Sequence, residues 1–512
     1  MNSNILLKRR IHFTLIGILV SLLIAPSLRA QQSLSLDECR KKALQHNHRV
    51  IIASEAAQAA NDIKKSAFTQ FLPDVRFNGG YLHTNKNWNL FQNDMFLPIV
   101  PFQTIDPQTG QFNKQVLQDP ALAMKTLAIN PQTGQPIMDA NGNPVFQQYA
   151  LLPAEKLKLD RRDFYFAKFS VTQPIFTGFK IVETNNIARF TKEIANEKIR
   201  LTKAELLYQT DEAYWRVISL EEKVKLATSY EKLLDQLVSD LTNIYEEGMI
   251  TRNDLLKAKV KQNEAKLKLL KARNGLKLSR MALAQIIGST TSDIHLADNI
   301  DEEQANEMLF DLAGTTPYNI ENRAEISMLK QKVAIAQSTE ALSRSRFMPN
   351  IALTGGYGWL NPNPYNGLKK EFGGDWNIGV VVSMPIFHWG DRVHTLNAAK
   401  RQHQIAQHEL EEAKEKINLQ IQQAWFRYDE AAKKMELTQS SKQQAEENMQ
   451  YAKENLSQGM GKLTDLLEAQ LEWEKASSEH IDAIIETKIT KSELDKATGT
   501  IYHYAEKYAT EN

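Results

Sequence analysis

Two stretches of the chain alternate between apolar and polar residues. Their apolar faces match 211 positions apart: Tyr165, Ala167, Phe169 and Val171 in the first, and Trp376, Ile378, Val380 and Val382 in the second. A period of two with one apolar face predicts half-buried strands over 164–175 and 375–386. Two further strands, over 75–84 and 351–360, alternate less cleanly because they contain paired glycines. Strands of about ten residues have the length of a membrane-spanning β-strand.

Long helical patterns fill most of the remaining chain. Residues 181–246 contain no proline or glycine, and a helix of that length would extend about 100 Å at 1.5 Å per residue. Its partner, 251–287, has a seam of leucine and alanine at steps of three and four residues. Lysine, glutamate and glutamine cover the other faces, which predicts solvated coiled coils. The same patterns predict helices over 36–71, 318–347, 391–457 and 462–498.

The chain contains one unit twice, in the order helix, strand, loop, strand, long helix, turn, helix. The segment Phe71-Leu72-Pro73-Asp74 returns 276 positions later, and Gln173-Pro174-Ile175-Phe176 returns 211 positions later, as Met384-Pro385-Ile386-Phe387. The difference falls in 85–163 of the first copy, which predicts a long external loop because surface loops tolerate insertions. We therefore expect a first repeat over 31–288, a second over 317–499 and a tail over 500–512, an α+β chain that is mainly α.

The N-terminus predicts a secretory signal peptide over 1–30. Lys8, Arg9 and Arg10 precede the apolar run 11–26, and Ala30 provides a small residue for cleavage. The alternative is a retained inner-membrane anchor. No later run reaches the roughly 18 apolar residues of a spanning helix, so we expect strands to make any membrane span of the mature chain.

The composition excludes several functional classes. The 62 Lys and Arg balance 61 Asp and Glu, which leaves no basic surface for nucleic acid. The single cysteine, Cys39, excludes an intramolecular disulfide and cysteine-cluster metal sites. No nucleophile elbow, phosphate loop or paired His-Glu zinc motif occurs. We therefore expect no enzyme, no cofactor and no metal site.

Four strands cannot close a barrel, and an open sheet edge inside a bilayer leaves unpaired amides that cost several kcal/mol each. The chain is therefore expected to oligomerise. Aromatic residues recur where helix meets strand, which favours an interfacial belt facing outer-membrane lipid, although core packing is the alternative for any one of them. These residues are Phe71, Phe176, Phe347, Phe387 and Trp389.

Together, the opening Leu34-Ser35-Leu36-Asp37-Glu38-Cys39 and the two glycine turns, Gly248 to Asp254 and Gly459 to Ala469, resemble the TolC-like outer-membrane efflux proteins. The resemblance covers essentially the whole mature chain. It implies a homotrimer with a 12-stranded outer-membrane β-barrel continued by a periplasmic α-helical coiled-coil barrel. It also implies an equatorial linker over 289–316, and docking to a periplasmic adaptor and an inner-membrane pump of a Gram-negative bacterium.

The resemblance also implies roles for residues at the two turns. The family's turns form the periplasmic entrance, and the matching constriction residues here are Asp465 and Glu468, one helical turn apart. Threefold repetition would bring six carboxylates together and favour cations. The alternative is an ordinary exposed helix start. Family members often tether the entrance through a Tyr and an Arg, but Leu456 and Gly461 stand there; the turn residues expected to supply substitute links are Gly248, Arg252, Asp254, Gly459 and Lys462.

The sequence thus predicts a passive outer-membrane duct for multidrug efflux or type I secretion. Drugs, metal cations, polysaccharide precursors and secreted proteins all use ducts of this kind. The alternative is a non-channel periplasmic coiled-coil adaptor of an export system. An adaptor does not need the matched amphipathic strand pair in each repeat.

Overall fold

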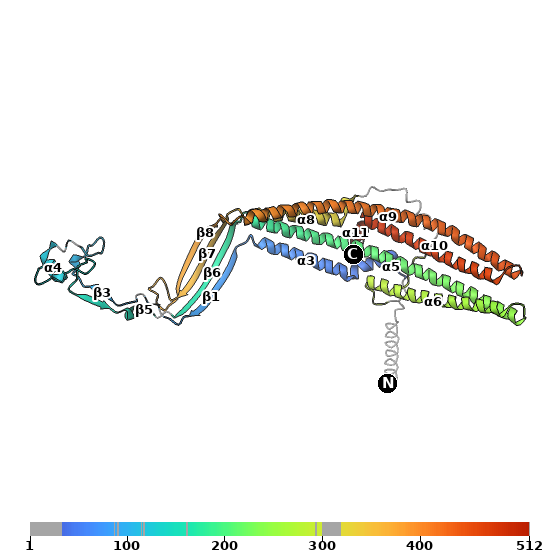
Figure 1. The fold of residues 1–512 in the computed structure, drawn as a ribbon, viewed down its shortest axis with the longest axis horizontal. Coiled ribbons are helices and arrows are strands. Elements are labelled where there is room, and N and C mark those ends of the chain that lie inside the picture. The colour runs from blue at the N-terminus through green and yellow to red at the C-terminus, as the bar shows by residue number, and fades with distance from the viewer. Residues whose placement is uncertain are drawn as a thin grey trace, which may run out of the picture. The chain divides into compact units, whose positions relative to one another are not determined.

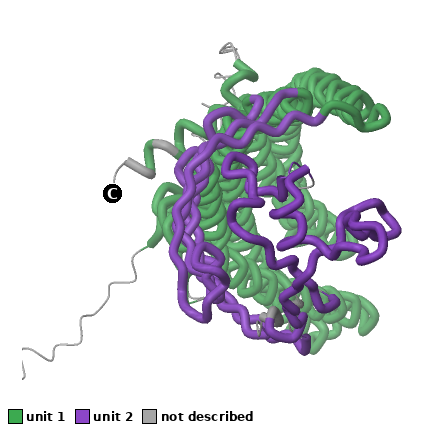
Figure 2. The backbone as a smooth tube through the Cα atoms, turned by 90° about the vertical axis from the view of Figure 1, so that its left-hand side faces the viewer, with its two compact units in different colours: residues 1–69, 179–347, 386–512 green, residues 70–178, 348–385 purple. Residues whose placement is uncertain are grey.

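The computed structural model describes residues 33–86, 88–89, 92–113, 115, 118–159, 162–291, 294–299 and 319–510. The chain divides into two compact units, coloured separately in Figure 2. Residues 70–178 and 348–385 form the strand unit, and residues 1–69, 179–347 and 386–512 belong to the helical unit. The expected signal peptide, 1–30, lies outside the described residues, as do 292–293 and 300–316 of the expected linker.

The strand unit contains a four-stranded antiparallel sheet in the order β1 (Asp74–His83), β6 (Asp163–Phe176), β7 (Asn350–Asn361) and β8 (Gly373–Ser383), as Figure 1 shows. The central pair, β6 and β7, joins a strand from each half of the chain. The backbones approach closely there: a Cβ on Gly356 would lie 2.6 Å from the carbonyl oxygen of Phe169. Among the described residues, β1 and β8 each pair along one edge only.

The predicted external loop, 85–163, contains secondary structure. It holds β2 (Trp88–Asn89), β3 (Met95–Pro98), η1 (Phe102–Thr104), α4 (Pro120–Thr126), β4 (Tyr149–Leu152), η3 (Ala154–Leu157) and β5 (Lys158–Leu159). β2 pairs with β5, and β3 pairs with β4, both antiparallel. Two small turns inside it have the same hydrogen bond. The side-chain oxygens of Asp106 and Asn130 each accept a hydrogen bond from the backbone amide two residues later. Such side chains nucleate turns locally, which explains why the insertion is folded.

The helical unit contains eight α-helices among its described residues. They are α2 (Leu36–His46), α3 (His48–Thr69), α5 (Lys180–Glu246), α6 (Arg252–Ile286), α8 (Ala324–Ser345), α9 (Asp391–Ser457), α10 (Leu463–Thr498) and α11 (Ile501–Thr510), with η5 (Ile320–Asn322) before α8. The expectation of an α+β chain that is mainly α is confirmed. Within the described residues, no helix is both long enough and apolar enough to cross a membrane.

The helix predicted over 36–71 is instead two helices, because the chain leaves helical geometry at Asn47. Its side-chain amide donates to the carbonyl oxygen of Ile286 at 2.9 Å, and its side-chain oxygen accepts from the Arg49 amide. Asparagine often interrupts helices in this way, because its side chain competes for backbone groups. Two smaller differences occur: α8 begins at Ala324, and the tail predicted over 500–512 contains α11.

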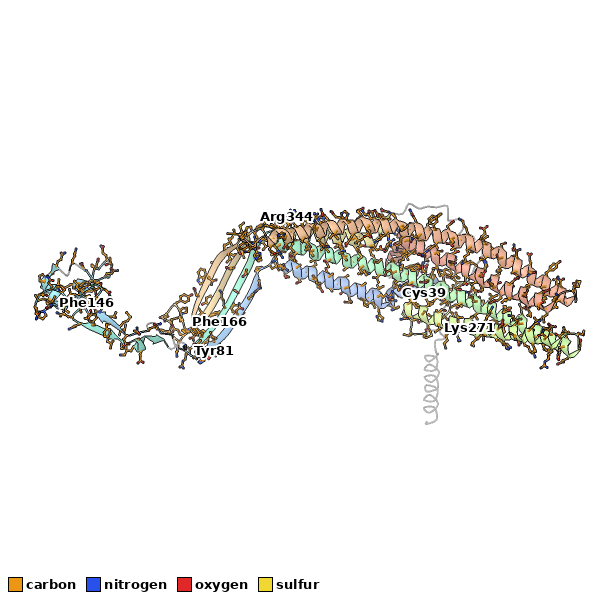
Figure 3. The ribbon with its side chains drawn as sticks, in the orientation of Figure 1. Cys39, Tyr81, Phe146, Phe166, Lys271 and Arg344 are labelled. Atoms are coloured by element: carbon orange, nitrogen blue, oxygen red, sulfur yellow. The ribbon has the colours of Figure 1, made fainter. Side chains whose placement is uncertain are left out.

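The core of the helical unit lies along α5, which packs against α2, α3, α6, α8, α10 and α11. α9 packs against α8 and α10. The largest buried cluster joins Cys39 of α2, Tyr214 of α5, Leu283 of α6 and Ile485 of α10. Figure 3 marks Cys39, whose thiol is fully buried. Burial raises the pKa of Cys39 to about 12, so this thiol stays protonated and unreactive at neutral pH.

Candidate functional site

The two helical hairpins turn at Gly248, between α5 and α6, and at Gly459, between α9 and α10. Their φ angles are 78° and 73°, in the left-handed region that glycine adopts most readily. In each turn, the amide after the glycine donates 3.0 Å to the carbonyl five residues earlier, which makes a Schellman cap. Both glycines are therefore required by backbone geometry. Their role at an entrance stays a prediction.

The first turn neutralises its own acidic residue. Thr251 caps α6, its hydroxyl accepting from the Asp254 amide at 3.2 Å and donating to the Asp254 carboxylate at 2.6 Å. The Lys257 ammonium lies 3.7 Å from the same carboxylate. Arg252 is exposed and makes no ion pair with any described residue. Sequence reasoning singled out Asp254 but missed Lys257, which its spacing of three residues could have revealed.

The second turn leaves its acidic residues open. Lys462 precedes α10 without capping it through its side chain. The Asp465 carboxylate accepts only a 3.2 Å hydrogen bond from the Thr464 hydroxyl within the described residues. Glu468 and, one turn later, Glu472 are exposed on the same face of α10. Glu472 extends the predicted carboxylate pair, and its spacing of four residues from Glu468 was the missed signal.

A groove of about 590 Å³ lies between α6 and α10 beside these turns. Glu468 lines it from α10, and Lys257, Lys261 and Glu264 line it from α6. The groove therefore brings Glu468 near the lysines of the first hairpin. Asp465 is absent from its lining, so the two predicted constriction residues have different surroundings in one copy.

The start of α10 is fixed to the first hairpin. Leu467 packs in a buried cluster with Tyr230 and Leu234 of α5 and Ala265 of α6. Further along, the Lys268 ammonium lies 2.7 Å from the Glu474 carboxylate, which links α6 to α10. The carboxylates at the second turn thus project from a helix whose opposite face is anchored.

A buried ion pair joins α2, α5 and α10 far from the turns. The Arg40 guanidinium donates two 2.7 Å hydrogen bonds to the Asp211 carboxylate, which is 1% exposed, and the Ser492 hydroxyl adds a third at 2.9 Å. Burial alone would lower the pKa of Arg40, but the hydrogen bond and charge of Asp211 outweigh it and raise that pKa. Sequence reasoning missed this pair, because no local pattern connects residues so far apart.

The five junction aromatics divide between the units. Phe71 and Phe176 belong to the strand unit, and Phe347, Phe387 and Trp389 belong to the helical unit. The rings of Phe387 and Trp389 lie 5.0 Å apart at 66°, and both side chains are exposed. Their exposure suits a nonaqueous surface. The belt they would form at a membrane interface stays a prediction.

Two consecutive residues at positive φ precede each of the long helices α5 and α9. These are Gly178 and Phe179 before α5, with φ of 60° and 68°, and Trp389 and Gly390 before α9, with φ of 47° and 83°. A bulky residue at positive φ is uncommon because its Cβ crowds the backbone. Phe179 and Trp389 are thus held in a fixed, strained direction at each helix start.

A sequence profile described as outer membrane efflux protein matches residues 152–289 and 319–500. The alkaline protease secretion protein AprF of Pseudomonas aeruginosa is 20% identical over 350 residues, which cover 65% of this chain and 71% of AprF. The cobalt-zinc-cadmium resistance protein CzcC of Cupriavidus metallidurans is 26% identical over 42% of this chain and 49% of CzcC. The chain therefore spans about half the length of CzcC.

A solved structure shares the fold. The outer membrane protein VceC of Vibrio cholerae superposes with a TM-score of 0.66 at 14% identity, over 91% of this chain and 96% of VceC. The described contacts include no group of three or more His, Cys, Asp or Glu that could hold a metal ion. Because the family profile matches more than half of its residues, the chain belongs to the outer membrane efflux protein family.

Proposed function

We propose that three copies of this chain form a passive export duct through the outer membrane. Each copy contributes four strands to a 12-stranded barrel and its hairpins to a helical tube in the periplasm. A periplasmic adaptor and an inner-membrane pump deliver substrate, and the pump supplies the energy. Membership of the family assigns the chain to efflux at the outer membrane, and the proposal adds the assembly and its route.

The observation that carries this proposal is the sheet with two open edges. β1 and β8 each leave one edge unpaired among the described residues, and large apolar side chains such as Phe77 and Ile378 are exposed. Unpaired amides cost several kcal/mol each in hydrocarbon, so a membrane sheet must close. Pairing of β1 in one copy with β8 of the next closes the sheet without any free edge.

The helical hairpins support a duplicated unit within each copy. α5 and α9 each contain 67 residues, and α6 and α10 contain 35 and 36. The two repeats, 31–288 and 317–499, would each supply one hairpin to the tube. Three copies would therefore present six similar hairpins at the periplasmic end.

At that end, we assign the constriction to Asp465 and Glu468. Both are exposed at the start of α10, where threefold repetition would place six carboxylates around one opening. Arg252, Asp254 and Lys462, beside the glycine turns, are the proposed links that hold the closed state. If charge reversal in Asp254→Lys left both the channel conductance and the drug resistance of the cells unchanged, Asp254 would have no gating role.

The names of the relatives differ: AprF is named for alkaline protease secretion, and CzcC is named for cobalt-zinc-cadmium resistance. We infer that members of this family export different substrates, and that the substrate of this chain depends on its partner pump. Nothing in the described residues favours the alternative of a coiled-coil adaptor. An adaptor does not need the amphipathic four-stranded sheet.

Reconstitution into a planar lipid bilayer tests the proposal. We expect discrete conductance steps from the purified protein, with cations passing more readily than anions because of the carboxylates at the entrance. A protein that inserts but never conducts, even after the turn residues Asp254 and Lys462 are replaced by neutral ones, would contradict a duct.

A further inference from the structure

The insertion between β1 and β6 carries an apolar ribbon, formed by β3 and β4. Phe96 pairs with Leu151 across it, and these side chains are 65% and 53% exposed. Leu97, on the opposite face, is also exposed. An isolated two-stranded ribbon is only marginally stable in water. Exposed apolar side chains on both of its faces lower its stability further. The ribbon therefore needs a partner.

The other described residues of the insertion do not bury this ribbon. Residues 99–148, which we call the head, have a small core of their own that includes Ala123, Thr126 and Leu127. The ring of Phe146, marked in Figure 3, packs edge-on against Phe112 at 5.0 Å. This packing stabilises the head, but Phe96 and Leu151 stay exposed beside it.

The insertion is also depleted in charge. Only five charged residues occur among the 58 residues of 95–152, whereas 24% of the whole chain is charged. The ribbon strands Met95–Pro98 and Tyr149–Leu152 contain none. Few charges combined with aromatic residues and methionine are typical of the centre of a protein–protein interface.

We propose that the ribbons of neighbouring copies pack against one another above the barrel and form a cap from three insertions. This inference rests on the proposed trimer. Twelve strands spaced about 4.8 Å apart and tilted by about 40° enclose a ring about 24 Å across, so equivalent points on three copies lie about 20 Å apart. Packed sheets lie about 10 Å apart, so each ribbon reaches its neighbour by leaning inward about 6 Å.

The connection to the barrel edge favours another copy over lipid as the partner. β1 is ten residues long, enough to cross a bilayer. The antiparallel pairing continues outward from its end, since the Thr84 amide donates to the Arg162 carbonyl at 2.7 Å and Trp88 pairs with Leu159. The apolar ribbon begins only at Met95, beyond the span that hydrocarbon would cover.

Cysteine cross-linking on intact cells tests this cap. The natural Cys39 is buried, so introduced cysteines are the reactive ones. Under a mild oxidant, we expect Phe96→Cys and Leu151→Cys to give disulfide-linked dimers at least several times more often than Gln132→Cys, a matched control in an exposed turn of the head. Gln132→Cys reports chance collisions between assemblies.

Three results would overturn the cap. The first is a trimeric extract in which neither ribbon cysteine links above the control, while both react with a water-soluble maleimide. The second is a trimeric extract in which neither thiol links or reacts, because something other than a neighbouring ribbon would then cover them. The third is a monomeric extract, which would contradict the proposed duct itself and remove the basis of the cap with it.

Discussion

Helices α6 and α10 occupy matching positions in the two repeats but have different surroundings. Leu256 of α6 is 51% exposed, whereas Leu467, 211 positions later, is 7% exposed. Met281 is 48% exposed, whereas the matching Ser492 is 8% exposed and bonds to buried Asp211. α10 packs against α5, α9 and α11, while α6 packs mainly against α5.

This difference leaves apolar side chains of α6 exposed in a single copy, including Leu256 and Val260, which border the groove between α6 and α10. The exposed apolar side chains of α6 follow one another at about helical spacing: Leu256, Val260, Leu267, Leu270, Leu278 and Met281. Such a continuous apolar stripe is typical of an interaction surface. In the proposed trimer, a neighbouring copy would cover α6 as the first hairpin covers α10 within one copy.

The charged residues at the starts of α6 and α10 also differ. Asp254 and Lys257 of α6 match Asp465 and Glu468 of α10 at the same offset. In the first hairpin, Lys257 lies one helical turn after Asp254. In the second hairpin, the carboxylate of Glu468 lies one helical turn after Asp465. Lysine at 257 and glutamate at 468 therefore make the first pair neutral and the second acidic, and the turns also differ at Arg252, which matches Leu463.

The largest expected effect tests how α10 is anchored. Asp211→Ala removes the buried carboxylate that Arg40 and Ser492 contact and leaves the guanidinium only its longer, 3.4 Å pair with the exposed Asp37, which should cost about 3 to 5 kcal/mol. Thermal unfolding of the detergent-extracted protein measures this loss of stability. The control, Asp482→Ala, breaks the half-exposed pair with Lys223 and should cost under about 1 kcal/mol. Equal losses in the two variants would show that the buried pair is not the anchor.

The matched leucines test the comparison directly. Leu467→Ala should destabilise the folded chain by about 2 kcal/mol, because it leaves a cavity in a buried cluster. Leu256→Ala should cost the single chain under about 0.5 kcal/mol, since that side chain is half exposed. We expect it instead to promote dissociation of the trimer on native gels as the detergent concentration is raised. A trimer that resists dissociation as the wild type does would mean that α6 is not an interface.

The acidic turn should control ion preference. The double variant Asp465→Asn, Glu468→Gln removes six charges from the proposed trimer, and we expect the ratio of K⁺ to Cl⁻ permeability to fall about fivefold, or roughly 1 kcal/mol. The matched variant Asp254→Asn, Lys257→Gln keeps the net charge and should leave the ratio unchanged. Reversal potentials in a salt gradient give both values. A larger change in the first-hairpin variant would place the constriction there.

The smallest effect concerns Asp495 of α10, where α6 has Ala284 at the matching position. Burial raises the pKa of Asp495 above its ordinary value, although Lys491 opposes the shift. The charged carboxylate thus costs stability at neutral pH, and this cost disappears as the pH falls toward about 4. Asp495→Asn should raise the melting temperature at pH 8 and give no gain at pH 4. A loss of stability at pH 8 would mean that the Lys491 pair outweighs burial.

The sequence predicted those features that local patterns encode. Apolar periodicity predicted the long helices and the strands around Phe169 and Trp376, and glycines predicted the turns at Gly248 and Gly459. These features depend on neighbours within a few residues. The repeat also aligned Asp254 with Asp465, which is the basis of the comparison above.

Other features depend on contacts between distant residues, which one sequence does not reveal. The break at Asn47 follows from its bond to Ile286, and the anchor follows from Arg40 meeting Asp211, 171 positions away. Burial of Leu467 and exposure of Leu256 likewise come from tertiary packing, because both have the same local pattern. The folded insertion was missed because its turns were interpreted as loop composition.

The most direct test of the central claim is the native mass of the protein extracted from the outer-membrane fraction in mild detergent. We predict the mass of three processed chains, in the fraction that contains outer-membrane lipid, because three open sheets would close one barrel and each copy would cover the α6 stripe of its neighbour. A monomer, or a protein found only in the soluble or inner-membrane fraction, would contradict the account.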